Sequence, residues 1–248
     1  MASSLIAGAV AGGVCDIALH PIDTLKTRLQ SSLRFKRGMF TGLYNGVGAV
    51  ALGSAPASGV FFLVYDEIKA SKLMPASPLG YAAAAGIADT VACVIRVPFE
   101  VIKQRSQASS RATSSLSIMK GLIRAEGARS LFSGFGATVM RDVPFSFIQF
   151  PIYETLKGPD DCPSLLAAFY GGVSGGIAAG FTCPLDVLKT RRMLGEKVTI
   201  SSKARTEGIR SLFKGVVPRV AFISLGGLVW FGSFEKTKYL LNTQSSVD

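Results

Sequence analysis

The charged groups best placed to act together in this sequence belong to one motif that occurs three times. Each copy starts with a proline and carries an acid two residues later and bases five and seven residues later. The acid and the first base are three residues apart, so on a helix they share one face and can form an ion pair. They can also pair from helix to helix, in a closed ring around a central axis. The six residues are Asp23, Lys26, Glu100, Lys103, Asp186 and Lys189.

A second motif also occurs three times, as an aromatic residue, an acid, two further residues and a base. Charges inside a membrane are costly and mostly face a bundle interior or a watery cavity. Because desolvation offsets the attraction in a buried ion pair, such pairs gain little net energy and suit a gate that opens and closes. We therefore expect the first set to form an inner gate and the second an outer gate. The residues of the second set are Asp66, Lys69, Glu154, Lys157, Glu235 and Lys238.

The elements that must position these charges are six apolar stretches. A repeat this long is a structural module, and three modules, 1–76, 77–160 and 161–248, divide the chain. Charged residues make up only 17% of it, and the mean hydropathy is +0.38. Each module has two stretches near the length that crosses a bilayer, which predicts an all-α membrane protein with six spans around a central cavity and short helices between them. The stretches are 4–30, 47–72, 79–107, 135–157, 164–193 and 216–240.

Prolines within the odd stretches predict kinks at matching depths. The segments 31–41, 109–133 and 194–214 are basic in a chain of net charge +11. By the positive-inside tendency they face the inner compartment, with both termini on the outer side. The start of the sequence lacks the features of a cleavable signal.

The composition also argues against several kinds of site. Four scattered cysteines and a single histidine make no zinc pattern. The sequence contains no glycine-rich phosphate loop and no pairing of a nucleophile with histidine. We therefore expect no metal, no cofactor and no enzymatic activity.

Charged residues that break the threefold pattern are candidates for binding an asymmetric substrate. When the repeats are aligned on their prolines, or on the glycines that open the even stretches, five charges at mid-membrane depth lack a charged counterpart. Arg219 also breaks the pattern, but it lies near the basic end and is left out of the predicted site. The five residues are Asp16, Asp89, Arg96, Arg141 and Asp142.

The charge of this set constrains the substrate. Three acids against two bases disfavour nucleotides and bare dicarboxylates, because these ligands need a basic site. The balance favours a zwitterion with an additional positive charge, its carboxylate on Arg141 and its cationic groups on Asp142 and Asp89. Asp89 can instead pair with Arg96, two helical turns away. Arg141 and Asp142 are adjacent, so we expect them to occupy different helical faces and to find separate partners.

The chain resembles the mitochondrial carrier family over nearly its whole length. The resemblance rests on all three P-x-[DE]-x-x-[KR]-x-[KR] motifs, all three [FY]-[DE]-x-x-[KR] motifs and the E-G-x-x-x-x-[FY]-x-G segments at 126–134 and 207–215. It implies a monomeric six-helix carrier of the mitochondrial inner membrane, with a central site that opens alternately to the intermembrane space and the matrix.

The sequence departs from the family pattern in two places. The first matrix segment has Arg37-Gly38-Met39 in place of an acid-glycine start, which bears on the length of the first matrix helix. In the third repeat, Met193 stands where the other repeats have Gln30 and Gln107. This predicts that one glutamine brace of the inner gate is missing.

Finer resemblance within the family lies in segments 96–105, 141–151 and 224–227. It implies S-adenosylmethionine as the substrate and S-adenosylhomocysteine as the counter-substrate. Asp142 stands where the resembled carriers typically have glutamate, which is longer by one methylene.

The adenine of such a ligand needs an apolar or aromatic wall, for which Phe61, Phe145 and Trp230 are candidates. The main alternative is a carrier for a basic or neutral amino acid that uses the same arginine and acid. A soluble nucleic-acid-binding protein is disfavoured, because the basic residues cluster at the ends of apolar helices instead of forming a stripe on a polar domain.

Overall fold

The fold is built from helices whose order follows the three repeats. The computed structural model describes the backbone of residues 2–31, 39–71, 78–109, 114–157, 163–196 and 198–244. Within these ranges there are α-helices, short 3-10 helices and turns but no strand, which confirms the predicted all-α fold. The elements are α1 (Ala2–Gln30), α2 (Val47–Ala70), α3 (Pro78–Gln107), α4 (Ser115–Glu126), η1 (Ala128–Phe132), α5 (Phe135–Lys157), α6 (Ser164–Phe181), α7 (Cys183–Met193), α8 (Ile200–Glu207), η2 (Ile209–Phe213) and α9 (Val216–Gln244).

Five predicted spans correspond to the single helices α1, α2, α3, α5 and α9, whereas the span predicted at 164–193 is broken into α6 and α7, which are bent by 71°. Thr182 lies at the break, and its hydroxyl donates to the carbonyl of Ala178 at 2.7 Å. Pro184 stands in the first turn of α7, where its missing N–H is tolerated. By contrast, α1 and α3 run through Pro21 and Pro98 as single helices, so the three prolines do not act alike.

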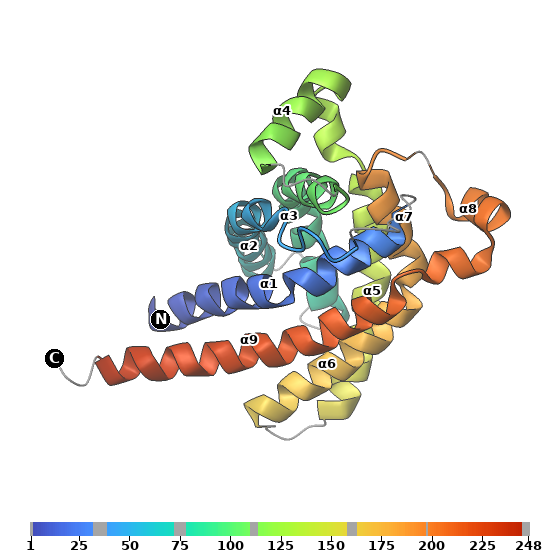
Figure 1. The fold of residues 1–248 in the computed structure, drawn as a ribbon. Coiled ribbons are helices and arrows are strands. Elements are labelled where there is room, and N and C mark those ends of the chain that lie inside the picture. The colour runs from blue at the N-terminus through green and yellow to red at the C-terminus, as the bar shows by residue number, and fades with distance from the viewer. Residues whose placement is uncertain are drawn as a thin grey trace.

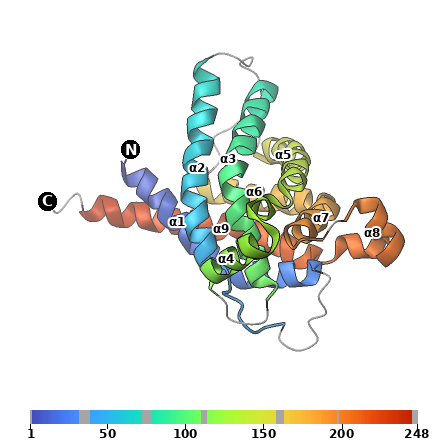
Figure 2. The same cartoon turned by 90° about the horizontal axis from the view of Figure 1, so that it is seen from above.

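The long helices form a ring in which the first and the last are neighbours. α1 packs against α9, α9 against α6, α6 and α7 against α5, α5 against α3, and α3 against α2. Figures 1 and 2 show that α1 begins and α9 ends side by side at one edge of the molecule, with α8 at the opposite edge. Small residues allow close approach: a Cβ added at Gly172 of α6 would lie 2.7 Å from the carbonyl oxygen of Ser224 in α9.

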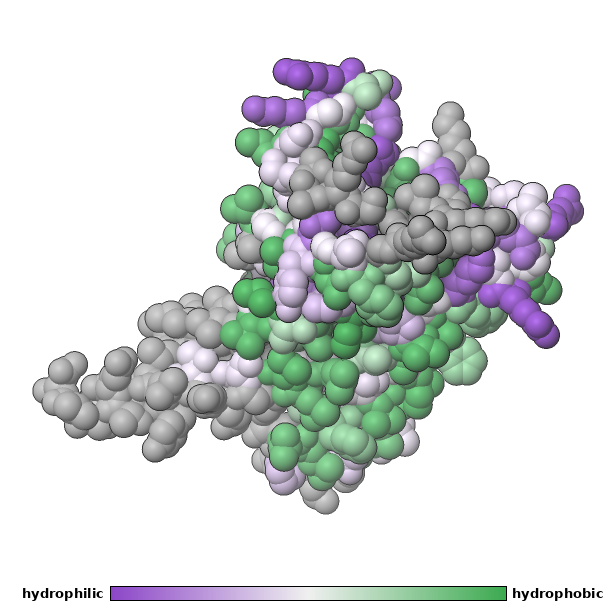
Figure 3. Space-filling model, in the orientation of Figure 1, coloured by the Kyte–Doolittle hydropathy of each residue, from purple (hydrophilic) through white to green (hydrophobic). Residues whose placement is uncertain are grey.

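The surface is apolar over the body of the bundle, and hydrophilic side chains gather over α4 and α8 (Figure 3). Leu63, Phe181 and Val217 have 72%, 74% and 75% of their surface exposed, which suits lipid better than water. Among the described residues, Val47–Ala70 and Ile209–Val229 are long and apolar enough to cross a membrane by themselves. The bent pair α6 and α7 adds a third such span if it is counted as one.

Short helices occupy the second and the third basic connections. The hydroxyl of Ser114 caps α4, and Thr199 and Ser202 form a capping box at the start of α8. In the first repeat, residues 39–46 form turns that lead into α2. Residues 32–38, on which the prediction about the first matrix helix falls, lie outside the described residues.

A glycine with positive φ stands directly before each of α2, α5 and α9. These are Gly46, Gly134 and Gly215, with φ of 89°, 86° and 79°. A Cβ added at Gly134 would lie 2.9 Å from the side chain of Met193 in α7. The glycine therefore allows the start of α5 to approach the charged segment of a neighbouring helix.

Candidate functional site

Three ion pairs join α1, α3 and α7 in a closed ring. Each pair connects two different helices, so the repeated charges pair from helix to helix. Lys103 Nζ lies 2.7 Å from Asp23, Lys26 Nζ lies 2.8 Å from Asp186, and Lys189 Nζ lies 2.9 Å from Glu100. We call these six residues the inner ring. Because every acid meets the lysine of another repeat, the ring holds the three repeats together at one level of the bundle.

Two contacts of the inner ring are braced by a glutamine amide. At the first, Gln107 Nε2 donates to Asp23 at 2.9 Å, while Gln107 Oε1 accepts from the hydroxyl of Thr27 at 2.8 Å. The amide thus ties the acid of the ring to a second side chain of α1. The corresponding residues at the second contact are Gln30, Asp186 and Thr190, with distances of 2.9 and 2.7 Å.

The third contact, between Glu100 and Lys189, has no such brace in the described part of the chain. Met193 takes the position of the glutamine and is fully buried in an apolar cluster that includes Val97. Gln104 stands where the other repeats have threonine, and its Oε1 is buried without a hydrogen-bond partner among the described residues. The three contacts therefore have the same charges but differ in the hydrogen bonds that neighbouring side chains make to them.

Asp186 is surrounded by more positive charge than the other ring acids. Arg219 of α9 lies 3.0 Å from it and is only 1% exposed, and Arg141 approaches to 3.9 Å. Arg219 also donates to the carbonyl and hydroxyl oxygens of Thr182, at 3.3 and 2.8 Å, where α6 breaks. Its omission from the predicted site overlooked this contact. The sequence did mark Arg219 as a charge that breaks the threefold pattern. It was left out of the predicted site because it lies near the basic end of its span.

A second threefold set lies beside the inner ring. The arginine at the end of each proline motif donates through Nε to a backbone carbonyl of another repeat. The three contacts are Arg28 to Gln107 at 2.8 Å, Arg105 to Met193 at 3.1 Å, and Arg191 to Gln30 at 3.0 Å. The triplicate motif marks these arginines, but a backbone acceptor leaves no trace in the sequence pattern.

The same arginines anchor the connecting segments. Arg105 makes a bidentate contact with Glu126 at 2.6 and 3.0 Å, and Arg191 makes one with Glu207 at 2.5 and 2.9 Å. These hydrogen bonds hold the pKa of both carboxyl groups below their usual range. In the first repeat, Arg28 donates to backbone carbonyls in the turn at 39–42 instead.

Four of the five asymmetric charges meet in one place, together with the thiol of Cys93. The Nη1 of Arg96 lies 3.1 Å from Asp89, and its Nη2 lies 2.9 Å from Asp142 and 3.0 Å from Cys93 Sγ. Arg141 Nη2 lies 2.7 Å from Asp142. We call Asp89, Arg96, Arg141 and Asp142 the charge cluster. It joins α3 to α5 and is electrically balanced.

The expectation that Arg141 and Asp142 find separate partners is wrong. Helical neighbours do point in different directions, but the long arginine side chain reaches back around the backbone. Asp142 bridges two guanidinium groups, with one carboxylate oxygen on Arg141 and the other on Arg96. Asp16 remains apart on α1, half-buried, and interacts electrostatically with Lys103.

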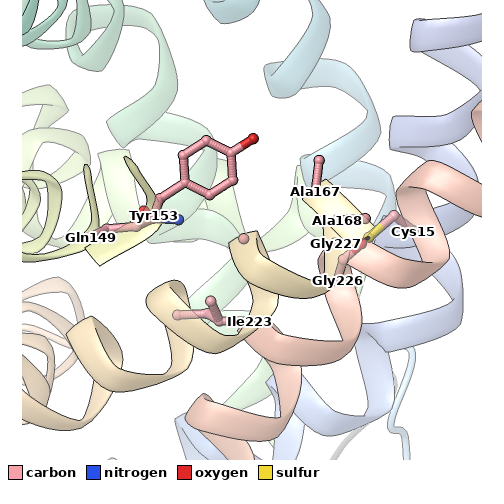
Figure 4. A pocket seen from close by; sticks show the side chains of 9 residues that line it. Cys15, Gln149, Tyr153, Ala167, Ala168, Ile223, Gly226 and Gly227 are labelled. Carbon is pink, nitrogen blue, oxygen red and sulfur yellow. Dashed lines mark hydrogen bonds between the residues drawn. The ribbon is translucent and has the colours of Figure 1, made fainter. Parts of the chain in front are cut away.

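A pocket of about 470 Å³ lies among α1, α5, α6 and α9. Figure 4 shows Gln149 and Tyr153 of α5 on one side of it and Cys15 and Gly226 on the other. Gln149 is seven residues from Asp142, so both lie on the same face of α5. The pocket is a mostly apolar space with one tyrosine ring, and it shares helix α5 with the charge cluster.

The predicted outer gate is only partly described. Asp66 and Lys69 are exposed on α2, and Lys157 is half-buried on α5. The side chains of Glu154, Glu235 and Lys238 lie outside the described residues, so this gate stays a prediction. The side chain of Trp230, a candidate for contact with adenine, also lies outside the described residues. Phe61, a second candidate, stacks on Tyr65 with ring centroids 6.0 Å apart.

Three repeats of paired helices around a ring of ion pairs define a membrane carrier. The sequence profile of the family described as "Mitochondrial carrier protein" matches residues 1–75, 74–158 and 160–245, and this chain belongs to that family. It is therefore a multi-pass transporter of the mitochondrial inner membrane and not an enzyme.

Similar proteins match over nearly the whole chain. The S-adenosylmethionine mitochondrial carrier protein homolog of Drosophila melanogaster is 44% identical, over 98% of this chain and 94% of that protein. The mitochondrial S-adenosylmethionine carrier protein of Xenopus tropicalis is 42% identical over 96% of each chain. The protein with the same description from Mus musculus is 40% identical, over 96% of this chain and 94% of that one.

Proposed function

We propose that this carrier imports S-adenosylmethionine into the mitochondrial matrix in exchange for S-adenosylhomocysteine. The observation that carries the proposal is the charge cluster together with an apolar pocket that shares α5 with it. Such a site combines charged groups of both signs with room for an aromatic ring. The substrate named in the descriptions of similar proteins from fly, frog and mouse supports the same ligand.

The ligand and the site are complementary in charge. S-adenosylmethionine has a carboxylate, an ammonium and a sulfonium, for a net charge of +1, and the charge cluster together with Asp16 carries −1. Arg141 binds the carboxylate, since guanidinium is the preferred partner of that group. Asp142 and Asp89 bind the positive groups, and Arg96 lies between them.

The adenosine end of the ligand enters the apolar pocket. Tyr153 lines this pocket and offers a ring for stacking, and Phe61, Phe145 and Trp230 stay candidates for the same role. Adenine is flat and largely apolar on its faces, so an aromatic wall gives it both area and favourable geometry.

Transport follows from alternate opening of the inner ring and the outer set of acids and lysines. Binding drives the change only if the ligand holds the occluded state more tightly than either open state. The inner ring serves as the matrix gate, and both termini face the intermembrane space, so the basic connections lie on the matrix side. The carrier acts as a monomer, because one chain supplies all three repeats.

The exchange moves charge. S-adenosylmethionine carries one positive charge inward and S-adenosylhomocysteine leaves as a neutral zwitterion. A membrane potential that is negative inside therefore assists import, by about 2.3 kcal/mol per charge per 100 mV.

Uptake into liposomes tests the proposal. The purified protein is reconstituted with internal S-adenosylhomocysteine, and uptake of labelled S-adenosylmethionine is measured against external S-adenosylhomocysteine, lysine, arginine and ADP. We expect saturable uptake that is inhibited by S-adenosylhomocysteine but not by lysine, arginine or ADP. The variant Arg141→Ala should reduce this uptake at least tenfold. No uptake of this ligand, with clear exchange of lysine or arginine, would instead favour the amino-acid carrier.

A further inference from the structure

We propose that Arg96 is a tethered cation that occupies the place of the substrate's positive groups in the empty carrier, and that the substrate must displace it to bind. Arg96 thereby limits the selectivity for substrates with two positive groups over those with one. The inference rests on the proposed function and adds a specificity-determining residue to it.

The geometry of Arg96 leaves no space for a second cation. Its Nη2 lies 2.9 Å from Asp142, 3.3 Å from Asp89 and 3.0 Å from the sulfur of Cys93. Ligand atoms of these three residues lie within 4.8 Å of one another, which is the spacing that a bound cation would need. The guanidinium fills this space, so any other positive group reaches both carboxylates only after Arg96 has moved.

Arg96 is held in a way that permits movement. Its side chain is 32% exposed, and its Nε is buried without a hydrogen-bond partner among the described residues. Glu100 follows it by one helical turn on the same face of α3 and already interacts with it electrostatically. The displaced guanidinium therefore has a second acid within reach.

The arrangement separates the two proposed substrates by charge. With its carboxylate on Arg141, a ligand has its ammonium beside Asp142, and its sulfur lies three carbon atoms further along the chain, towards Asp89. S-adenosylmethionine has a positive sulfur and replaces Arg96 at both acids. S-adenosylhomocysteine has a neutral sulfur and replaces it at Asp142 only.

The consequence is that Arg96 weakens binding of the doubly cationic ligand more than that of the singly cationic one. Removing the guanidinium leaves both carboxylates to the ligand, and the charge of the site becomes more negative by one. We expect Arg96→Gln to lower the KM for S-adenosylmethionine about tenfold and the inhibition constant of S-adenosylhomocysteine much less. Arg96→Lys keeps a cation at this position. It should leave the ratio of the KM for S-adenosylmethionine to the inhibition constant of S-adenosylhomocysteine within about threefold of that of the unaltered carrier.

The test measures the KM of labelled S-adenosylmethionine and the inhibition constant of S-adenosylhomocysteine in liposomes with a fixed internal counter-substrate. Increased selectivity in Arg96→Gln but not in Arg96→Lys supports the inference. A higher KM for S-adenosylmethionine in Arg96→Gln would overturn it, since Arg96 would then bind the carboxylate. Unchanged selectivity would overturn it as well.

Asp89→Asn provides a second variant in case Arg96→Gln does not fold. It removes the acid that faces the sulfur, so selectivity for S-adenosylmethionine should fall about tenfold, and an unchanged ratio would contradict the inference. If the unaltered protein takes up no S-adenosylmethionine, the proposed function fails and the inference fails with it. If the unaltered protein takes up S-adenosylmethionine but the variants do not change selectivity, the proposed function stands and only the inference about Arg96 is wrong.

Discussion

The three contacts of the inner ring carry the same charges but differ in their surroundings. The contacts at Asp23 and Asp186 each have a glutamine amide between the ring acid and a threonine. The contact between Glu100 and Lys189 has a buried methionine in place of the amide. Glu100 also lies one helical turn from Arg96, and Asp186 lies 3.9 Å from Arg141, so one unbraced and one braced contact both border the charge cluster.

Three copies of one motif therefore do not give the three contacts equal interaction free energies. Hydrogen bonds to charged groups contribute about 1.5–3 kcal/mol each, whereas buried ion pairs alone contribute little. The side chains around the ring charges therefore decide which repeats hold together most strongly. On this account α3 and α7 separate more easily than α1 and α3 or α1 and α7.

The largest expected effect compares two acids of the ring. Asp186→Asn leaves the buried Arg219 and the half-buried Lys26 without their acid and should lower the free energy of unfolding by about 3–5 kcal/mol. Glu100→Gln leaves Lys189 buried without its acid, while Arg96 keeps Asp89 and Asp142, so the free energy of unfolding should fall by clearly less. Thermal unfolding in detergent measures both, and equal losses would remove the difference between the contacts.

The braces themselves can be removed with a matched control. Gln107→Leu takes away the hydrogen bonds to Asp23 and Thr27 and should cost about 1.5–3 kcal/mol. Met193→Leu changes the equivalent position of the unbraced contact without removing an amide, and should cost less than about 1.5 kcal/mol. If the two variants unfolded alike, the glutamine would not act as a brace.

Adding an amide to the unbraced contact should slow transport. Met193→Gln can donate its two amide N–H groups to Glu100 and to the buried oxygen of Gln104, as Gln107 donates to Asp23. A stronger contact raises the barrier to opening, so we expect the uptake rate to fall about threefold to tenfold with little change in KM. An unaltered rate in a folded variant would show that this contact does not limit opening.

The smallest expected effect lies outside the ring, at Lys203 in α8. Its amino group is buried without a hydrogen-bond partner in the described part of the structure, and burial lowers its pKa to about 8, with Arg191 adding to the effect. Leu122 stands at the matching position of the second repeat and is also buried. Lys203→Leu should therefore raise the melting temperature by about 2–4 °C at pH 7.

The pH dependence of stability in Lys203→Leu tests whether the buried amino group of Lys203 causes the change. Because the pKa of Lys203 is lower in the folded than in the unfolded protein, the unfolded chain binds more protons between about pH 8 and 10.5. Stability of the unaltered protein therefore gains a contribution as pH rises across this window. Lys203→Leu should lose that gain, and an equal rise in both proteins would show that another group is responsible.

Much of the fold could be predicted from the sequence, because hydrophobic length and the repeated motif both indicate spans. The starts of α2 at Val47 and α5 at Phe135 agree with the expected spans. Kinks were expected at all three prolines and a bend of 71° lies beside the third, but the sequence could not predict that α1 and α3 continue as single helices through Pro21 and Pro98. What distinguishes the third is Arg219, a residue of another helix that binds the oxygens of Thr182.

The site was predictable in its residue types more than in its contacts. Absence of a charged counterpart in the other repeats identified the charge cluster, and repetition identified the inner ring. Neither pattern specifies distance, so the contact between Arg141 and Asp142 was missed. The backbone acceptors of Arg28, Arg105 and Arg191 were also missed, because every residue has a carbonyl.

Uptake of labelled S-adenosylmethionine by Asp142→Asn tests the central claim most directly, since Asp142 joins both arginines of the charge cluster and is the proposed partner of the ligand's positive groups. The matched control is Glu67→Gln, which neutralises an exposed acid on α2 outside the cluster. We expect Asp142→Asn to lower uptake at least tenfold and Glu67→Gln to stay within about twofold of the unaltered carrier. Equal uptake by all three proteins, or none by the unaltered carrier, would contradict it.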